Sequence, residues 1–388
     1  MTRFPLHRRA LMTGALATGA LALGGPGIAH ARTASDRKLV VVILRGAMDG
    51  LAALIPAGEA RYRELRRDLA ISGGFDVGQG FRLHPRLTNL YRAWGDNELV
   101  LLPATATGYR ERSHFDGQDY LEAGTAVIRD GWLNRALQLT RPNPSAVGIG
   151  QTVPLILRGN AAATSWSPGV LPDPSDDTIS RLIDLYAGDP RLAETLAMAV
   201  ETDAIAGGMS MAGMGGGSGP GQAYVQTARA AANLLAAPDG PGLAVMSLDG
   251  WDTHVRQGSD EGQLANRLGA LDEALGILRD GLAAHWPRTA VLMVTEFGRT
   301  VRANGSGGTD HGTAGTAFLL GGAVRGGRLI GDWPGLGTLH EDRDLIPANR
   351  TEDLFRTVLA EHWGLARSDL DRHVFPDQPG AGFEGLIG

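Results

Sequence analysis

The chain has 388 residues, of which 43% are hydrophobic and 20% charged, and its formal net charge at pH 7 is −6. This length suffices for one large α/β domain or two smaller ones, and the composition is that of a globular protein with a sizeable core. The absence of cysteine excludes a disulfide framework, a thiol nucleophile, a cysteine metal site and a lipoprotein anchor.

The first 31 residues have the features of a targeting segment. The pair Arg8-Arg9 precedes a mildly apolar run at 10–23, and Ala29-His30-Ala31 is typical of an A-x-A cleavage site. The twin arginine predicts recognition by the twin-arginine translocase and a periplasmic or secreted mature protein. An ordinary secretory signal or a membrane anchor is the alternative, although the run is too short and too interrupted by glycine to span a bilayer stably.

Removal of this segment makes the remaining chain, 32–388, more acidic. It takes away Arg3, Arg8 and Arg9 and no acidic residue, so the net charge falls by three, from −6 to −9. An acidic chain without a basic stripe is not expected to bind nucleic acid. No later apolar stretch is long enough to cross a bilayer, so no stable membrane span is expected.

Continuous apolar runs at 38–44 and 98–104 predict two buried strands. The first strand leads into Arg45-Gly-Ala-Met-Asp49. A carboxylate at this place is either a metal ligand or a loop residue that caps the next segment, and the pattern alone leaves both open. Amphipathic helices are predicted at 59–69 and 85–94.

A further helix is predicted to begin at Ser113, within Arg112-Ser113-His114-Phe-Asp116. One interpretation is a variant of the capping box, with Asp116 three residues after the serine. The other is a nucleophilic or metal-ligating serine at a helix N-terminus, where the dipole favours negative charge. His114 and Arg112 flank the serine and would bind an anion, or else lie on the surface.

The middle of the chain carries predicted helices at 131–140, 176–187 and 190–203, and a predicted strand at 153–158. The segment near 206–221 is rich in glycine, serine and methionine, which predicts a flexible loop within one domain. Its methionines are soft ligands that suit copper(I), but we prefer the interpretation of a loop that merely contains them.

Acidic and histidine side chains follow two predicted strands in the stretch 243–312. A strand at 243–248 runs into the sequence DGWDTH, a long helix with a leucine face follows at 261–284, and a strand at 289–295 ends in EFGRT. A glycine-rich loop then leads to Asp310-His311. The carboxyl ends of parallel strands share one edge, where ligands bind in open α/β sheets. Carboxylate oxygens and imidazole nitrogens bind divalent metals. The candidate metal ligands are therefore Asp49, Asp252, His254, Glu296, Asp310 and His311.

A last strand is predicted at 316–320, and a last helix at 351–363 that Gly364 ends. Strands and helices thus alternate along most of the chain. This alternation predicts an α/β fold with a doubly wound, largely parallel sheet and helices on both faces.

Several motifs together resemble one known family. LRGAMDG, RSHFDGQDYLEAG, DGWLNRAL, SLDGWDTH, VTEFGRT and GTDHGTAG occur in this order in an uncharacterised bacterial family of twin-arginine-exported proteins, the domain of unknown function 1501. That family looks like a distant branch of the alkaline phosphatase and sulfatase superfamily. The resemblance implies an alkaline-phosphatase-like α/β sheet with metals at the carboxyl ends of its strands. It also implies hydrolysis or transfer of phosphate or sulfate esters.

The superfamily pattern maps onto this sequence in part. By this resemblance Asp49 matches a metal-binding carboxylate after the first strand, and Ser113 falls near the nucleophile. Asp252 and His254 match an Asp-to-His pair after a strand, and His311 matches a later metal histidine.

Three departures concern the metal ligands. Glu296 is followed by Phe297 where the pattern has histidine, and Asp252 and His254 are closer in sequence than usual. Asp310-His311 is the alternative candidate for the displaced Asp-His pair. These departures leave open whether one or two ions bind and whether catalysis is retained.

The combined expectation is an exported, metal-dependent hydrolase of a small-molecule phosphate or sulfate ester, with zinc, manganese, magnesium or calcium as the ion. Ser113, His114 and Arg112 are the expected catalytic residues. Arg45 and Arg299 are expected to hold substrate oxygens, because guanidinium forks match such groups. The alternatives are a catalytically degenerate envelope binding or assembly protein on the same fold, and a metal-free serine esterase. The esterase is disfavoured because no G-x-S-x-G surrounds the serine.

Overall fold

A mixed β-sheet forms the centre of the molecule. The computed structural model describes residues 36–127, 130–141, 144–167, 176–186, 188–207, 220–378 and 380–388, and within these residues the sheet has nine strands. Their order is β11-β5-β10-β9-β1-β8-β6-β7, with β12 paired to β5.

The middle strands are continuous apolar runs that pair in parallel. β1 (Lys38–Arg45) lies between β8 (Leu243–Asp249) and β9 (Thr289–Val294) and is parallel to both. Arg45 pairs with Asp249, and Ile43 pairs with Val294. The carboxyl ends of the three strands therefore lie side by side, and the segments that follow them meet at one edge of the sheet.

The outer strands keep the sheet largely parallel, with β10 as the exception. β10 (Gly315–Leu320) runs antiparallel to both of its neighbours, β9 and β5 (Leu99–Ala106). The remaining strands are parallel to their partners: β6 (Ala146–Ile149), β7 (Thr164–Trp166), β11 (Arg328–Leu329) and β12 (Asn349–Arg350).

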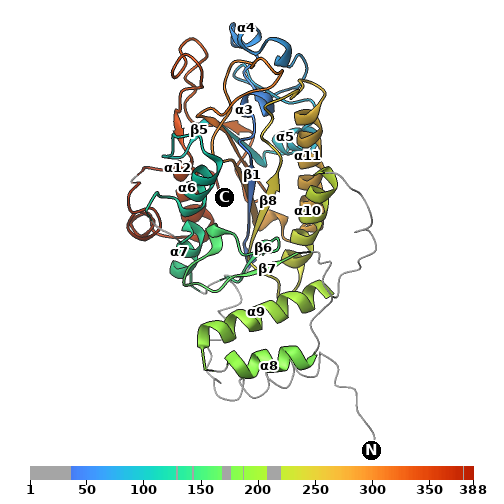
Figure 1. Cartoon of the computed structure of the whole chain (residues 1–388), viewed down its shortest axis with the longest axis vertical. Helices are drawn as coiled ribbons and strands as arrows, with labels where there is room; N and C mark the ends of the chain where they lie inside the picture. Colours follow the sequence, from blue (N-terminus) through green and yellow to red (C-terminus); the bar gives the residue numbers. More distant parts are fainter. Residues whose placement is uncertain are drawn as a thin grey trace, which may run out of the picture.

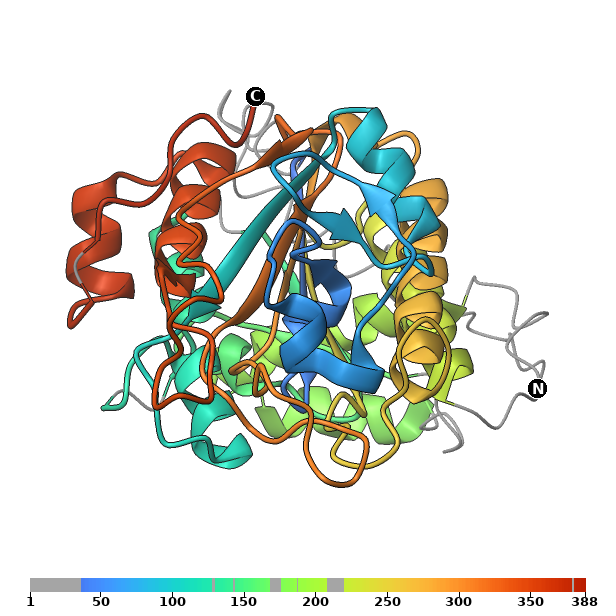
Figure 2. The same ribbon diagram turned by 90° about the horizontal axis from the view of Figure 1, so that it is seen from above.

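Helices cover both faces of the sheet (Figures 1 and 2). One face carries α5 (Thr88–Gly95), α10 (Pro220–Ala236) and α11 (Gln263–Gly281). The other carries α6 (His114–Ala123), α7 (Trp132–Leu139) and α12 (Thr351–Trp363). Alternate residues of β1 enter the two core clusters: Val40 and Val42 on the α11 side, Val41 and Ile43 on the α12 side. The prediction of a doubly wound α/β fold is confirmed.

Shorter elements complete the described chain. A three-stranded sheet, β2 (Leu54–Ile55), β4 (Arg82–Leu83) and β3 (Phe75–Asp76), lies near α3 (Gly50–Ala53) and α4 (Tyr62–Arg66). The helices α8 (Asp176–Tyr186) and α9 (Pro190–Gly207) lie together at the lower end of Figure 1. The other short helical segments are η2 (Arg67–Leu69), η3 (Leu155–Leu157), η4 (Trp286–Arg288), α13 (Arg367–Asp369) and η5 (Leu370–Val374).

The predicted strand at 153–158 is wrong. Leu155–Leu157 form the 3₁₀ turn η3, and the Ile156 N–H donates to Glu122 Oε2 of α6 at 3.0 Å. A side chain from a distant helix therefore takes the donor that a neighbouring strand would have used.

Two expectations concern residues outside the described ranges. The targeting segment 1–31 lies outside them, as does most of the glycine- and methionine-rich segment, and both expectations stay predictions. Among the described helices, none has the length and apolar character needed to cross a bilayer.

A buried histidine joins α12 to the first strand. His362 is 1% exposed, and its Nε2–H donates to the Lys38 carbonyl at 3.0 Å. Burial lowers the pKa of His362 from 6.5 to about 4. In the unfolded chain this histidine takes up a proton near pH 6.5, whereas in the folded chain it does so only near pH 4. The stability that depends on neutral His362 is therefore present above this window and is lost as the pH falls through it.

We expect this group to lower the free energy of unfolding by about 3 kcal/mol between neutral pH and about pH 4, because each pKa unit of the shift corresponds to about 1.4 kcal/mol. Urea unfolding of wild type and of His362→Gln at the two pH values measures it, with the exposed His373→Gln as control. The His362→Gln variant should lose less stability on acidification than wild type and the control. Equal losses in all three proteins would contradict the assignment.

Candidate metal centre

The segment after β8 is fixed against the end of β1 by a buried tryptophan and a glycine. Trp251 is fully buried, and its Nε1–H donates to the Leu248 carbonyl at 2.9 Å. Gly46 has φ +111°, and a Cβ there would lie 2.7 Å from the Asp252 backbone nitrogen. Only glycine suits such a position. Asp252 is therefore held beside the carboxyl end of β1.

The segments that carry Glu296 and His311 pair with each other. Arg299 and His311 form an antiparallel bridge, and the Gly312 N–H donates to the Gly298 carbonyl at 2.8 Å. A Cβ on Gly298 would lie 1.8 Å from the Ala314 carbonyl oxygen, so the two backbones approach as closely as glycine permits. This pairing brings His311 back to the end of β9.

The third contributor is the first turn of α6. His114 is the first residue of that helix, and its ring stacks on Phe297 with a centroid distance of 5.0 Å. Phe297 is 4% exposed and also contacts the ring of His311, at 5.4 Å between centroids. Phe297 thus forms a rigid apolar support for two imidazoles.

Four side chains, His114, Asp252, His254 and His311, converge at this edge. The Nε2 atoms of His254 and His311 are 3.0 Å apart, and Asp252 Oδ1 lies 2.9 Å and 3.2 Å from them. Asp252 Oδ2 lies 3.4 Å from His114 Nε2. Single ligand atoms of His114, Asp252 and His311 lie within 4.8 Å of one another, as a common metal ion requires. Each of the four side chains is between 23% and 39% exposed, so a ligand reaches the group from solvent.

Each of the three imidazoles has its Nδ1 bonded to a fixed oxygen. The pairs are His114 with Glu296 Oε1 at 2.8 Å, His254 with Asp310 Oδ1 at 3.2 Å, and His311 with the Arg112 carbonyl at 2.9 Å. A carboxylate or carbonyl oxygen only accepts hydrogen bonds, so each Nδ1 carries the hydrogen. In the neutral ring Nε2 then carries a lone pair. The tautomers are thus assigned from the bonding partners.

The Nε2 atoms of His254 and His311 face each other, and all three Nε2 atoms lie near the carboxylate of Asp252. His114 Nε2 is buried and has no hydrogen-bond partner among the described residues. Lone pairs of neighbouring rings repel unless a proton or a cation lies between them. Histidines that bind metals have this arrangement, with one nitrogen donating to an oxygen and the other directed at the ion.

The charge states of the surrounding groups suit a cation. Burial alone would raise the pKa of Asp252 and of Glu296. The Arg299 guanidinium nevertheless holds the pKa of Asp252 below its ordinary value. Hydrogen bonds from His114 and Gln118 do the same for the pKa of Glu296. Both carboxylates are therefore ionised at neutral pH. The hydrogen bond to Glu296 raises the pKa of His114, and burial lowers the pKa of His311.

The structure places Asp49 beneath this group, in a buried ion pair. Asp49 is 1% exposed, its Oδ2 is paired with an Arg66 guanidinium that is also fully buried, and Gln257 Nε2 donates to the same oxygen at 2.7 Å. Gln257 Oε1 in turn accepts from the hydroxyls of Thr253 and Thr309, at 2.7 and 2.8 Å. Asp49 therefore fixes the segments on either side of the cluster.

Arg45 and Arg299, predicted to bind substrate, and Arg112, predicted to be catalytic, all face carboxylates. Arg299 is buried and is paired with Asp252. The Arg45 guanidinium lies 2.6 Å from Glu122. That of Arg112 lies 2.9 Å from Asp344 and 2.5 Å from the exposed Glu341. Each guanidinium is therefore already held in place by an acid.

Ser113 stands at the N-cap of α6, directly before His114. Its side chain makes no capping hydrogen bond, and its backbone N–H donates to the Tyr109 hydroxyl at 3.0 Å. The Ser113 hydroxyl therefore does not cap the helix by a hydrogen bond, as a simple N-cap serine would.

Several residues of the site carried no local sequence signal. Gln118 donates to Glu296 at 3.0 Å, and Asn304 donates to Asp310 at 3.0 Å and to the His254 carbonyl at 2.9 Å. Arg66 and Gln257 also act only through tertiary contacts. A polar residue on an amphipathic helix or in a loop is recognised as part of a site only when its partners are known.

Residues 102–374 match the family model described as protein of unknown function (DUF1501). No curated protein matches the sequence.

Three solved structures illustrate the similarity of fold. A phosphonate monoester hydrolase of Agrobacterium radiobacter has a TM-score of 0.43 and 11% identity, over 90% of this chain and 79% of that one. An alkaline phosphatase superfamily protein from Vibrio parahaemolyticus has a TM-score of 0.40 and 13% identity, over 89% and 70%. The zinc complex of the C-terminal periplasmic domain of EcEptC from Escherichia coli has a TM-score of 0.37 and 12% identity, over 74% and 72%. At this level of similarity the activities of these proteins do not transfer to this chain.

Replacing Arg66 should destabilise the fold strongly, because Asp49 would remain as a buried, uncompensated charge. We expect Arg66→Met to lower the free energy of unfolding by about 3–5 kcal/mol in urea titrations. The control Arg63→Met removes an exposed arginine of the same helix and should change it by less than about 0.5 kcal/mol. Similar stabilities for the two variants would show that Asp49 does not depend on Arg66.

Proposed function

The chain belongs to the DUF1501 family of proteins of unknown function, and from the geometry of its site we propose that this member is a metal-dependent hydrolase of phosphate or sulfate esters. The single observation that carries the proposal is the convergence of three imidazole Nε2 atoms on Asp252, with each Nδ1 bonded to a fixed oxygen.

The spacing of His114, Asp252 and His311 suits one ion that keeps a coordination position open. Their ligand atoms all lie within 4.8 Å of one another, and Asp252 oxygens lie 3.4 Å and 3.2 Å from the Nε2 atoms of His114 and His311. His254 Nε2 lies beside this group, 2.9 Å from Asp252 Oδ1 and 3.0 Å from His311 Nε2. Glu296 orients His114 and Asp310 orients His254, each through the Nδ1 atom of the ring.

The donor set selects among the candidate ions. Two imidazole nitrogens and one carboxylate suit zinc, whereas magnesium and calcium prefer sites made of oxygens. We therefore propose a single zinc ion, with manganese as the next candidate.

A divalent cation, when bound, polarises the ester oxygens and lowers the pKa of an adjacent hydroxyl. The residues of the chain supply the rest. Asp252 contributes negative charge and is itself held by Arg299, while Phe297 excludes water from one side of the imidazoles. The fixed acceptors on Nδ1 keep the three rings from rotating, so little reorganisation is needed when substrate binds.

We assign the attacking hydroxyl to Ser113. Its position directly before His114 and its lack of a capping hydrogen bond support this assignment. The Ser113 hydroxyl loses its proton to solvent, and its oxygen forms a bond to phosphorus or sulfur while the ester oxygen leaves with the bonding electrons and takes up a proton from solvent. Water then hydrolyses the enzyme ester and returns the serine hydroxyl. For Arg112 to bind substrate oxygens, its guanidinium would exchange the exposed Glu341 for the substrate.

Protein purified with its native metal should contain about one equivalent of zinc, because the three ligands define one site with a position left open for substrate. Metal analysis of His311→Ala and Asp252→Ala should show at least a tenfold lower content, and His373→Ala, which removes an exposed histidine elsewhere, should retain it. Circular dichroism checks that the variants are folded. A full metal content in both site variants would reject the assigned ligands, and metal-free wild type without turnover of any ester would favour a binding protein on the same fold.

Ser113→Ala should abolish turnover of a panel of aryl phosphate, phosphodiester and sulfate esters while leaving the metal content unchanged. Loss of a covalent nucleophile lowers the rate by orders of magnitude. Because the serine makes no capping bond, the free energy of unfolding should change by less than about 0.5 kcal/mol. Turnover retained in this variant, with metal still required, would reject the covalent mechanism.

A further inference from the structure

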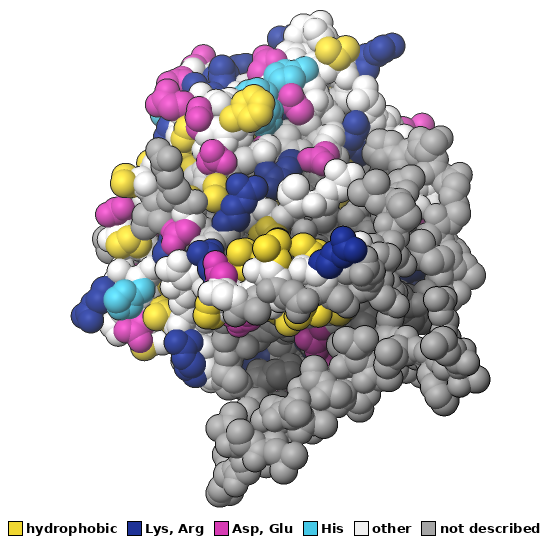
Figure 3. Space-filling view, turned by 60° about the horizontal axis from the view of Figure 1, so that its bottom comes forward, with side chains coloured by type: hydrophobic (Ala, Val, Ile, Leu, Met, Phe, Trp, Pro, Cys, Tyr) yellow, Lys and Arg dark blue, Asp and Glu magenta, His cyan; other side chains and the backbone are white. Residues whose placement is uncertain are grey.

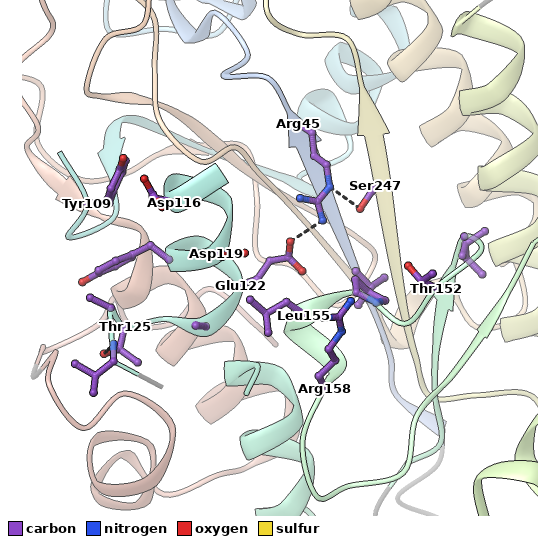
Figure 4. A pocket seen from close by; sticks show the side chains of 18 of the residues that line it. Arg45, Tyr109, Asp116, Asp119, Glu122, Thr125, Thr152, Leu155, Arg158 and Ser247 are labelled. Atoms are coloured by element: carbon purple, nitrogen blue, oxygen red, sulfur yellow. Dashed lines mark hydrogen bonds and ion pairs between the residues drawn. The ribbon is translucent and has the colours of Figure 1, made fainter. Parts of the chain in front are cut away.

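A large recess lies beside α6 and over the ends of β1 and β8. Its volume is about 950 Å³, near the upper end of the range of about 300–1,000 Å³ in which small-molecule sites lie. Arg45 and Ser247 enter it from the two strands, Glu122 from α6, and Arg158 from the segment after η3 (Figure 4). This volume far exceeds what a single phosphate or sulfate group fills.

The recess presents free hydrogen-bonding groups of both kinds. The carboxylates of Asp116 and Asp119 are exposed and have no hydrogen-bond or ion-pair partner in the part of the chain that the structure describes. The amide of Gln151 and the hydroxyl of Thr152 are equally unpartnered there. Among the described residues, the Arg158 guanidinium bonds the protein only through Nε, to the Val153 carbonyl at 2.9 Å. Acceptors and donors thus surround the same space.

Aromatic rings complete the lining. Tyr109 and Tyr120 lie on the α6 side, with a centroid distance of 6.3 Å. The hydroxyl of Tyr109 accepts from the Ser113 N–H, and that of Tyr120 accepts from Gln378. With both hydroxyls engaged, the rings offer mainly their apolar surfaces to a ligand.

The charge of the lining argues against an anion as the occupant. Arg45 and Arg158 are opposed by Asp116, Asp119 and Glu122, and Arg45 is already paired with Glu122 at 2.6 Å. Basic and acidic side chains are also interspersed on the face drawn in Figure 3. A second anion would therefore meet unpaired carboxylates without a free cluster of cations.

The recess is connected to the candidate metal centre. Arg45 Nη1 donates to Gln118 Oε1 at 2.7 Å, and Gln118 Nε2 donates to Glu296 Oε1 at 3.0 Å. The same Glu296 oxygen accepts from His114 Nδ1. A ligand in the recess would therefore contact the helix that carries the candidate metal ligand His114, and the chain of hydrogen bonds that leads to it.

We propose that this recess binds a neutral saccharide. Sugar hydroxyls both donate and accept hydrogen bonds, so they require carboxylates beside guanidinium and amide groups, and the C–H face of a sugar ring packs on tyrosine. Under the function proposed above, on which this part rests, the saccharide is the portion of the ester that does not react. Its phosphate or sulfate group reaches the metal centre while the sugar hydroxyls are bound by the side chains of α6 and the η3 segment.

The test measures binding without catalysis. Saturation-transfer NMR is recorded on the mature chain, 32–388, with maltotriose, cellotriose and mannotriose as probes, in zinc-loaded and chelator-treated samples. At least one trisaccharide should bind in both samples. The double variant Asp119→Ala, Arg158→Ala should raise its dissociation constant at least about tenfold, because two charged hydrogen-bonding groups are lost. The matched control Asp280→Ala, Arg63→Ala removes an exposed acid and an exposed arginine away from the recess and should leave it unchanged.

The outcomes separate this proposal from the hydrolase assignment. Binding that persists in chelator-treated protein supports the recess even if no ester is hydrolysed, whereas failure of the hydrolase assignment would show in metal content and turnover. Absence of binding for all three trisaccharides would overturn the saccharide proposal. An equal loss of affinity in the control variant would also overturn it. The same holds if ethylammonium or inorganic sulfate binds in place of the sugars and the Asp119→Ala, Arg158→Ala variant abolishes that binding.

Discussion

The candidate site depends on which ring nitrogen carries the hydrogen in each of three histidines. Glu296, Asp310 and the carbonyl of Arg112 accept the Nδ1–H of His114, His254 and His311 in turn. Because each ring is committed on one side, its other nitrogen offers a lone pair, and the backbone brings three such nitrogens to one carboxylate. Without these acceptors the rings would be free to rotate or to exchange tautomers, and no common point would be defined.

A buried polar network holds the acceptors and the carboxylate at fixed positions. Arg299 pairs with Asp252 and donates through Nε to Thr309 at 3.1 Å; Thr309 bonds Gln257, and Gln257 bonds Asp49. A buried polar network restricts the side chains that form it, and removing a charged member leaves its partner uncompensated. The fold thus joins the ends of β1, β8 and β9 through hydrogen bonds as well as through backbone pairing, and the recess beside α6 connects to this group through Glu296.

The sequence predicts the parts of this arrangement that depend on local pattern. Buried parallel strands need continuous apolar runs, so these runs alone predicted β1, β8 and β9. They also predicted that the segments after these strands meet at one edge of the sheet. The 153–158 run failed as a strand because Glu122 of a distant helix takes its backbone donor. For the same reason the burial of Asp49 against Arg66 had no local signal. His114 was expected beside the serine as an anion-binding residue, and only the tertiary structure places its Nε2 opposite Asp252.

The most direct measurement of the central claim is X-ray absorption at the zinc edge of the metal-loaded protein. The account predicts about four nitrogen or oxygen ligands at about 2.0–2.1 Å, with outer-shell scattering from two imidazoles. It further predicts that His114→Ala reduces the imidazole number from two to one. A first shell of oxygen ligands without imidazole scattering, or an imidazole number that the variant leaves unchanged, would contradict the proposed centre.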